Sequence, residues 1–418
     1  MAAKKRRKKP SRKAQKFDKI GLASLNLLST TPRPDGRGPT TTRKFYARLI
    51  TILLQIFRHC AGKLNPIILN FFMDYVCLKC QRKLVDRDND WYCEYCQISW
   101  PKIHGLDCFF DRDDYWGEIS RDEMKQLLAS IERDGWQKAN RELAQKDPQR
   151  LKFIYNPGRA DWRFYVPLDN QSVVLDAGCG LGAITLPLAE VVKEVVAFDT
   201  SCERARFVQL RAAKENKTNI QVLVASLFNP PFKKQSFDLI VMNGLLEWVG
   251  AGKIDGNPGE IQIEALKKMK ELLKPGGCLY IGIENRFGLP LLTGRGLDHS
   301  GLRFTSIMPR FLARIYAKIR RKSDYRTYTY TRRGYEKLLN DAGFENIDFF
   351  LPWPGYNDTR IIVPHRNLNA LRYLVLNIMS SNSFVKKIVK IAIRIPFVLR
   401  LYRFLFFSFG IVANKNKQ

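Results

Sequence analysis

Short apolar runs alternate with amphipathic stretches in the middle of the chain. The apolar runs are typical of strands buried on both faces, and they lie at 173–177, 194–199, 220–226, 237–244 and 278–284. The stretches between them predict helices at 183–192, 202–217 and 261–273. A further helix and strand are expected in TRRGYEKLLNDAGFENIDFFLPWPGYN. This alternation predicts an α/β domain with a doubly wound parallel sheet, whose ligands bind at the carboxyl ends of the strands.

The turn after the first predicted strand carries three alternating glycines, Gly178, Gly180 and Gly182. Glycine lets a loop pass close to a ligand, because a Cβ would obstruct it. Asp199 ends the second strand, where an acid can bind ribose hydroxyls. The G-x-G-x-G spacing differs from that of pyrophosphate binders, and the carboxylate of Asp176 would repel a phosphate but pair with an ammonium group. The pattern therefore favours S-adenosylmethionine (SAM) over NAD or FAD, with a glycine turn in another α/β fold as the alternative.

The motifs between residues 171 and 363 resemble those of class I SAM-dependent methyltransferases. LDAGCGLG is similar to the family's first motif, AFDT to its ribose-binding acid and VASLFNPPF to its adenine-side segment. FDLIVMNGLLEWV and LLKPGGCLYIGIEN are similar to its fourth-strand and fifth-strand motifs. The resemblance implies a Rossmann-like seven-stranded sheet, closed by SFGIVANK as the final strand. It also implies SAM contacts at Asp176, Gly178, Gly180, Gly182, Asp199, Ser226 and Asn243, although many relatives carry an acid where Ser226 stands.

The NPPF segment at 229–232 resembles the motif with which amino-methyltransferases hold a planar nitrogen. In those enzymes the motif follows the fourth strand, whereas here it precedes FDLIV. We interpret NPPF as a turn into that strand rather than as a catalytic motif.

Four of the nine cysteines form two C-x-x-C pairs, Cys77 with Cys80 and Cys93 with Cys96. Two such pairs separated by twelve residues present four thiolates for a tetrahedral, structural zinc site, with disulfides or redox pairs as the alternative. Residues 74–111 resemble the small zinc ribbons that are fused to, or partnered with, methyltransferases. The other cysteines are scattered, which suits a reducing compartment.

Composition adds a strongly basic character. The 418 residues include 70 Lys and Arg against 40 Asp and Glu, a net charge of +30. Such a charge predicts an anionic partner, either nucleic acid or membrane. Residues 1–42 begin with a KKRRKK cluster that resembles a nuclear localisation signal or a nucleic-acid arm, and we expect a disordered basic tail there.

Two further segments, 43–73 and 364–418, mix basic, aliphatic and aromatic residues. We expect amphipathic helices in both, with the final strand at the end of the second. No run reaches ~18 apolar residues without a charge, so a membrane-spanning helix is not expected. The composition fits segments that lie in a membrane interface, or ordinary helices packed on the core. No signal-peptide core follows the basic start, so we expect a cytoplasmic protein, with peripheral attachment to the inner face of the membrane as one option.

The regions on either side of the predicted sheet are expected to enclose the two substrates. Residues 112–170 predict one or two helices that cover the cofactor site. Arg159 and Trp162 in this leader either lie near SAM or pack against the sheet. Residues 286–330 form a long insertion at the ligand edge, where insertions commonly carry function, and we expect this segment to be the acceptor cap.

The cap holds the only Asp-His pair of the chain, Asp298 with His299. A hydroxyl acceptor loses its proton as the methyl group is transferred, and histidine is the usual base near neutral pH. We therefore predict His299 as the general base, Asp298 as its orienting acid and Glu284 beside the methyl group. A loop histidine that only makes backbone hydrogen bonds is the alternative.

The wider pattern resembles bacterial methyltransferases associated with cell-surface glycan assembly, through YWGEI, RADW, NGLLEWVG, GIENRFG, LDHSGL, YRTYTYT and PGYN. This resemblance implies O-methylation of a sugar or glycolipid acceptor, and basic segments would suit an anionic inner leaflet. A zinc ribbon joined to a methyltransferase also resembles ribosomal-RNA methyltransferases, and a basic chain would bind RNA phosphates. An rRNA or tRNA methyltransferase is therefore the main alternative, and a non-catalytic scaffold is a third.

Overall fold

The computed structural model describes residues 73–110, 115, 117, 119–252, 255–296, 298–379 and 391–416. The basic tail predicted at 1–42 lies outside the described residues, as do all but the last residue of the segment 43–73 and part of the segment 364–418. The chain divides into the units Met1–Asn70 and Phe71–Gln418, and every element below belongs to the second. Among the described residues, no helix has the length and apolarity needed to cross a membrane.

In the described part of the chain, twelve strands form one sheet. They are β1 (Val85–Asp86), β2 (Asp90–Cys93), β3 (Ile98–Ile103), β4 (Leu106–Cys108), β5 (Val173–Ala177), β6 (Glu194–Asp199), β7 (Ile220–Val224), β8 (Phe237–Asn243), β9 (Leu273–Glu284), β10 (Glu345–Gly355), β11 (Asp358–Pro364) and β12 (Ser408–Asn414). The α-helices are α2 (Arg121–Asp134), α3 (Trp136–Lys146), α4 (Pro148–Tyr155), α5 (Thr185–Leu188), α6 (Cys202–Lys214), α7 (Pro258–Leu272), α8 (Leu289–Leu292), α9 (Arg310–Arg321), α10 (Arg332–Asp341), α11 (Leu368–Tyr373) and α13 (Pro396–Phe404). A 3₁₀-helix η1 (Pro157–Phe164) and a π-helical turn η2 (Leu374–Ile378) complete the set.

The sheet order is β1-β2-β3-β4-β7-β6-β5-β8-β9-β12-β10-β11. The strands from β4 to β9 in this order are parallel, and β12 inserts antiparallel between β9 and β10. The predicted α/β fold is therefore confirmed, and SFGIVANK does form the last strand. The predicted number of seven strands was too small, because β1–β4 extend one end of the sheet and β11 the other.

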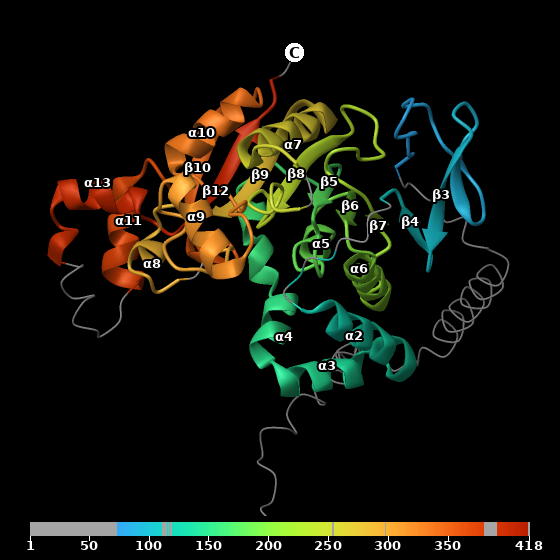
Figure 1. Ribbon diagram of the computed structural model, residues 1–418, viewed down its shortest axis with the longest axis horizontal. Helices are drawn as coiled ribbons and strands as arrows, with labels where there is room; N and C mark the ends of the chain where they lie inside the picture. Colours follow the sequence, from blue (N-terminus) through green and yellow to red (C-terminus); the bar gives the residue numbers. More distant parts are fainter. Residues whose placement is uncertain are drawn as a thin grey trace, which may run out of the picture. The chain divides into compact units, whose positions relative to one another are not determined.

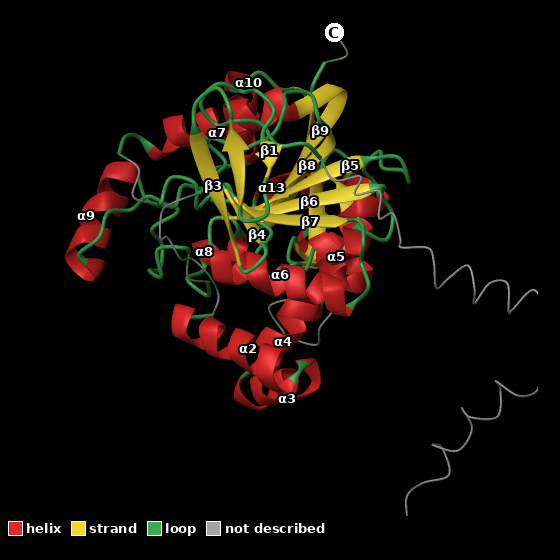
Figure 2. Ribbon diagram, turned by 90° about the vertical axis from the view of Figure 1, so that its right-hand side faces the viewer, coloured by secondary structure: helices red, strands yellow, loops and turns green. Residues whose placement is uncertain are grey.

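Both faces of the sheet are covered by helices (Figures 1 and 2). Alternate residues of a strand point to opposite faces, so β5 sends Leu175 to the face under α7 and α10 and Val174 to the face over α5 and α6. Every residue of β6 and β7 is buried, which explains why both strands are apolar apart from Glu194, Asp199 and Gln221. Burying each such Val, Leu or Ile side chain contributes about 1.5–3 kcal/mol.

Two local predictions need correction. The helix expected at 183–192 is reduced to the four residues of α5. Its late start agrees with Pro187, which has no N–H for the Ala183 carbonyl and whose ring crowds that carbonyl. The leader contains three α-helices and η1, not one or two helices, and it packs on α6 through Phe207.

The cysteine-rich segment joins the main sheet through β4, whose Asp107 and Cys108 pair with Leu223 and Val224 of β7. Tyr75 packs against Phe232 at a ring distance of 6.1 Å, and Phe232 packs against Phe237 at 5.3 Å. The NPPF segment itself forms neither helix nor strand and leads toward β8, in agreement with its interpretation as a turn. Its buried Phe232 joins the cysteine-rich segment to the core.

Candidate active site

The glycine loop after β5 lies at the carboxyl edge of the sheet. Gly178, Gly180 and Gly182 have φ values of +70°, +58° and +74°, a left-handed backbone that favours glycine. The N–H groups of Gly178 and Cys179 both donate to the Phe198 carbonyl at 2.9 Å. The conformation required at each glycine explains the alternating pattern, which the sequence argument had attributed only to the approach of a ligand.

The carboxylate of Asp199 is held at the end of β6. Its Oδ2 accepts a hydrogen bond of 3.0 Å from the Gly180 N–H, and its Oδ1 accepts one of 3.0 Å from the Ser201 N–H. Arg204 places Nη1 3.7 Å from Oδ2. The predicted ribose-side acid therefore lies against the glycine loop, with its orientation fixed by backbone groups.

Asp176 is buried at the end of β5 and accepts a hydrogen bond of 2.6 Å from the Thr185 hydroxyl. Burial raises the pKa of Asp176 to about 6, while the Thr185 hydrogen bond and the charge of Arg159 act in the opposite direction. Arg159 also donates a hydrogen bond of 3.1 Å to the Asn357 side-chain oxygen. Trp162 instead stacks on Tyr280, with ring centroids 3.9 Å apart, and packs the leader against the sheet.

Asn243 ends β8 beside β9. Its amide is buried, and neither its oxygen nor its nitrogen has a hydrogen-bond partner among the described residues. A Cβ at Gly282 would collide with the Asn243 side-chain oxygen, so glycine on β9 leaves room for this amide. Ser226 follows β7 and accepts a bond of 3.3 Å from the Phe228 N–H. A buried amide without a partner calls for an explanation, and a ligand bound at this edge of the sheet would supply one.

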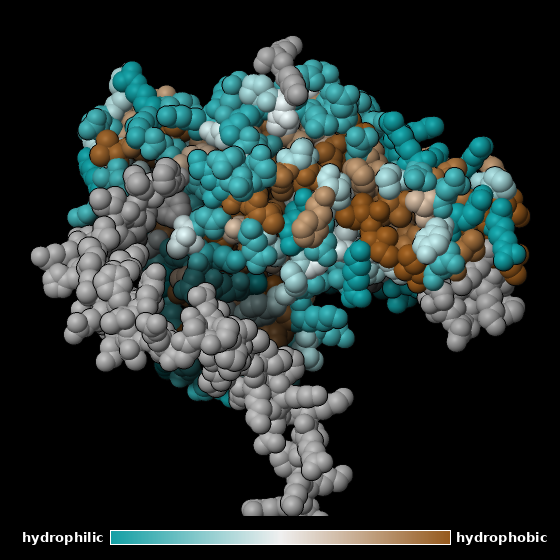
Figure 3. All heavy atoms as spheres, turned by 180° about the vertical axis from the view of Figure 1, so that it is seen from behind, coloured by the Kyte–Doolittle hydropathy of each residue, from teal (hydrophilic) through white to brown (hydrophobic). Residues whose placement is uncertain are grey.

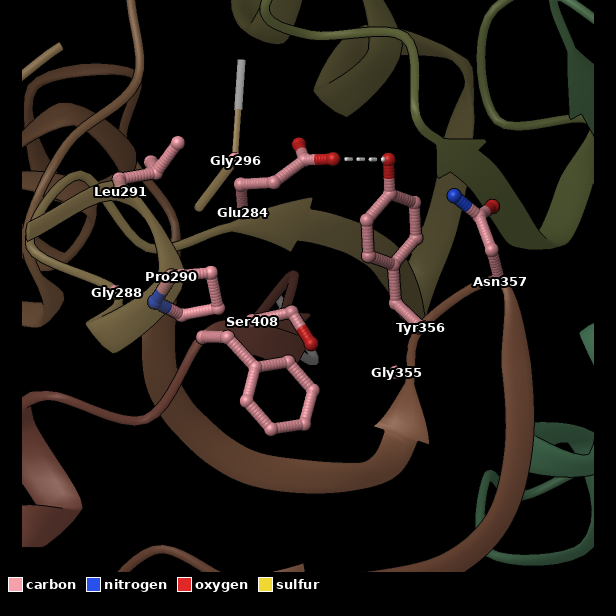
Figure 4. Close-up of a pocket in the computed structure, with 10 residues that line it drawn as sticks. Glu284, Gly288, Pro290, Leu291, Gly296, Gly355, Tyr356, Asn357 and Ser408 are labelled. Carbon is pink, nitrogen blue, oxygen red and sulfur yellow. Dashed lines mark hydrogen bonds between the residues drawn. The ribbon is translucent and has the colours of Figure 1, made fainter. Parts of the chain in front are cut away.

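Three titratable side chains from separate segments meet next to this edge. His299 of the cap places Nε2 3.0 Å from Oε2 of Glu284, at the end of β9, and 3.5 Å from Oε1 of Glu247, which follows β8. Glu284 also accepts a hydrogen bond of 2.8 Å from the Tyr356 hydroxyl, as Figure 4 shows. The Trp248 ring stands edge-on to the imidazole, with ring centroids 4.9 Å apart.

The electrostatics of this cluster favour a protonated imidazole in the free protein. Burial alone would lower the pKa of His299, but the hydrogen bond to Glu284 and the charges of Glu284, Glu247 and Asp298 raise it to about 9. Burial raises the pKa of the fully buried Glu247 to about 8, and the charge of Glu284 adds to the rise. Desolvation opposes ionisation of Glu284 too, yet His299 and the Tyr356 hydroxyl bring its pKa below the usual value.

Asp298 does not contact the His299 ring through a hydrogen bond. Its carboxylate accepts bonds from the Ser300 N–H at 2.8 Å and the Ser306 hydroxyl at 2.7 Å, and thereby fixes the turn that carries His299. Glu284 takes the orienting position that we had expected for Asp298. Sequence reasoning missed Glu247, for which an acid within the apolar stretch LLEWV was the available signal.

A cavity of about 230 Å³ adjoins Glu284 and Tyr356 (Figure 4). Pro290 and Leu291 from the start of the cap form part of its wall, and Phe407, which directly precedes β12, forms another part. The cavity thus combines apolar walls with a carboxylate and a phenol.

The four cysteines of the C-x-x-C pairs gather at the other end of the sheet. Their sulfur atoms lie within 4.8 Å of one another. Cys77 Sγ accepts bonds of 3.4 Å from the Lys79 and Cys80 N–H groups, and Cys93 Sγ accepts one of 3.4 Å from the Cys96 N–H. Both pairs therefore fold as similar tight turns around one centre.

Comparison with known proteins supports the same reading of the central domain. Residues 175–281 match the methyltransferase domain family. The chain is 26% identical over 188 residues to the demethylmenaquinone methyltransferase of Lactococcus lactis, covering 42% of this chain and 67% of that protein. It is 29% identical over 152 residues to the ubiquinone biosynthesis O-methyltransferase of Xanthomonas campestris, covering 35% of this chain and 58% of that protein.

Solved structures of similar fold include the Haemonchus contortus phosphoethanolamine N-methyltransferase 2 in complex with SAM. It shares 15% identity with a TM-score of 0.39, over 72% of this chain and 61% of that chain. The glycine loop, the two fixed carboxylates and the buried amide of Asn243 fit SAM. With the family match at residues 175–281, they identify this chain as the carrier of a class I SAM-dependent methyltransferase domain.

Proposed function

We propose that this protein transfers the methyl group of SAM to an oxygen atom of a sugar or glycolipid intermediate of cell-surface glycan assembly. The observation that carries the proposal is the Glu284–His299 pair, with 3.0 Å between its atoms, at the same sheet edge as the glycine loop and next to a cavity. An imidazole with its own carboxylate is suited to remove a hydroxyl proton. An apolar wall beside polar groups suits an acceptor with a lipid portion.

The donor side is assigned to the residues of the glycine edge. Asp176 pairs with the ammonium group of SAM, Asp199 binds the ribose hydroxyls, and Ser226 lies on the adenine side. The Asn243 amide supplies the N–H donors of its NH₂ group and a carbonyl acceptor at the end of β8. SAM, when bound, supplies an electrophilic methyl group.

The residues on the acceptor side remove the proton of the acceptor hydroxyl. In the unprotonated imidazole of His299, Nε2–H donates to the Glu284 carboxylate, so Nδ1 is the atom that accepts the proton of the acceptor hydroxyl. The O–H bond breaks as the new O–CH₃ bond forms and the S–CH₃ bond breaks, and the proton remains on the imidazole. Glu284 and Glu247 stabilise the resulting imidazolium through their proximity to Nε2.

An acceptor of this class would be held at a membrane, and the insertion between β11 and β12 supports peripheral attachment. On α13, Phe397 is 72% exposed and Leu401 49%, and Arg400 stands between them. Hydrophobic side chains gather on the side of the molecule where α11 and α13 lie (Figure 3). Apolar and cationic groups on one surface fit the interface of an anionic inner leaflet.

The test is transfer of labelled methyl groups from SAM into separated pools of lipid-linked glycan, quinone lipid, RNA and protein. Quinone lipid is included because two relatives are named for menaquinone and ubiquinone methylation. We expect label in the glycan pool. Label in RNA alone would favour the rRNA or tRNA alternative, and label in quinone lipid alone would replace the glycan assignment.

We further propose that Cys77, Cys80, Cys93 and Cys96 hold a structural zinc ion. Four thiols within 4.8 Å, with N–H groups donating to their sulfur atoms, provide the donor set that zinc prefers. Elemental analysis should find about one zinc per chain. Cys93→Ser should release it, whereas Cys278→Ser, at a buried cysteine in β9, should retain it.

A further inference from the structure

Helix α9 directs its apolar side away from the protein. Phe311, Leu312, Ile315 and Ile319 are 64%, 44%, 53% and 73% exposed. Their spacing places them on one face, because residues one, four and eight apart fall within one arc of an α-helix. The helix packs on the protein through the opposite face, where Ala313 and Ala317 are buried.

The orientation is the reverse of that found in an ordinary surface helix, which buries its apolar stripe and exposes its charges. The cap adds three more exposed apolar side chains, Phe287, Leu289 and Phe304, with exposed fractions of 37%, 38% and 39%. Several large apolar side chains exposed on one face of a helix indicate an interaction site. Figure 2 shows α9 standing out from the body of the domain, at the left edge of the view.

Cations flank the apolar face. The helix contains no acidic residue, and Lys318, Arg320 and Lys322 at its C-terminal end are exposed. The nearby Asp324 pairs with Arg314 at 3.0 Å, so its charge is already compensated. An apolar stripe bordered by cations complements a layer with an apolar interior and an anionic surface. An RNA backbone would use the cations but leave Phe311, Ile315 and Ile319 in water.

We propose that α9 docks the cap onto an anionic phospholipid bilayer, with the face formed by Phe311, Leu312, Ile315 and Ile319 inserted among the lipids. This proposal extends the proposed function and rests on one part of it, namely that the acceptor is held at a membrane. The same cap supplies Pro290 and Leu291 to the cavity and His299 to the reacting centre. Docking through α9 therefore presents the catalytic cap to an acceptor embedded in the bilayer.

The test is co-sedimentation of the full chain with phosphatidylcholine vesicles that contain or lack phosphatidylglycerol. The double variant Phe311→Asp/Ile319→Asp should weaken binding to the anionic vesicles by about tenfold or more, since it places charge on the inserting face. Phe164→Asp is the matched control, because Phe164 of η1 is 71% exposed on another element. SAM affinity should be equal in all three proteins, which verifies folding.

A second pair of variants separates this inference from the broader proposal. If Phe397→Asp/Leu401→Asp on α13 abolishes vesicle binding while the α9 variant binds as tightly as wild type, the membrane proposal stands and the α9 inference is wrong. Unchanged vesicle binding together with weaker binding of an RNA oligonucleotide by the α9 variant would also overturn it. Charge reversal by Lys318→Glu/Arg320→Glu should remove the preference for phosphatidylglycerol if α9 meets the lipid surface.

Discussion

The two halves of the catalytic edge are built from different parts of the chain. The centre of the donor half is one βαβ unit, β5-α5-β6, where the N–H groups of Gly180 and Ser201 donate to Asp199. Ser226 after β7 and Asn243 at the end of β8 add side chains to it. The acceptor half collects ionisable side chains from four segments, through Glu247, Glu284, His299 and Tyr356. The donor half thus depends on left-handed backbone geometry, and the acceptor half on charges enclosed in protein. Substitutions in the donor half should therefore change SAM affinity, and substitutions in the acceptor half should change the rate of methyl transfer.

The His299→Ala variant should show the largest difference between its effect on the acceptor half and its effect on the donor half. Removing the base should lower kcat by about 100-fold or more, since general base catalysis contributes that much, while SAM affinity is unchanged. Labelled methyl transfer at saturating SAM measures the first quantity and calorimetry the second. His104→Ala, in an exposed turn of the cysteine-rich segment, serves as the control. Activity within a few-fold of wild type would remove His299 from this role.

Gly178→Ala should have the opposite effect, because it should lower SAM affinity rather than act on the proton transfer. Alanine at a φ of +70° costs about 1–3 kcal/mol, and its Cβ would lie 2.7 Å from a Leu245 methyl group. SAM binding should weaken by about tenfold or more, because the loop must shift. Gly135→Ala has a φ of +80° but nothing within 4 Å, so it should lower stability and leave SAM affinity intact. Equal SAM affinities in both variants would contradict the assignment of the loop.

The pH dependence tests the acceptor half alone. A protonated His299 cannot accept a proton, so kcat/KM should rise as the pH increases through about 9. Glu247→Gln removes one of the charges that raise the pKa of His299, and the rise in kcat/KM should move to lower pH. A profile that is identical in the variant would show that Glu247 does not act on the imidazole.

The same ionisation affects stability. Because the folded-state pKa of His299 is raised above the usual 6.5, its pairing with Glu284 contributes fully below pH 6.5 and is lost as the pH rises through about 9. Chemical denaturation of wild type and His299→Ala across this range should therefore converge at high pH.

The smallest effect is expected from Asp298→Ala. The loss of its bonds to Ser300 and Ser306 should lower stability by about 1 kcal/mol. The kcat should fall only a few-fold, since Glu284 still holds the imidazole. A loss as large as that of His299→Ala would restore Asp298 as the orienting acid that the sequence suggested.

Much of the donor half could be predicted from the sequence because its information is local. The strands from β5 to β9 bury both faces, so their apolar runs were plain, and the alternating glycines reflect three left-handed positions in one loop. Pro187 was a local sign that the helix would start late, but the helix at 183–192 was predicted from its apolar pattern alone.

The acceptor half was only partly predictable because its contacts are distant in sequence. Glu284 and His299 were predicted separately, but the bond between them is made by the folding of the cap. Tyr356, whose hydroxyl donates a hydrogen bond to Glu284, lies in the turn between β10 and β11, 72 residues later in the chain. The addition of β1–β4 to the sheet was not predicted, because β4 pairs with β7 and the two strands belong to segments that were expected to form separate domains.

The attachment of the cysteine-rich segment to β7 also has a consequence for solubility. A strand at the edge of a sheet exposes N–H and C=O groups that can pair with another chain. Here β4 occupies that edge of β7, and the ladder continues outward through β3, β2 and β1. A chain shortened to the methyltransferase domain would expose the buried apolar strand β7, and we expect it to aggregate through that strand.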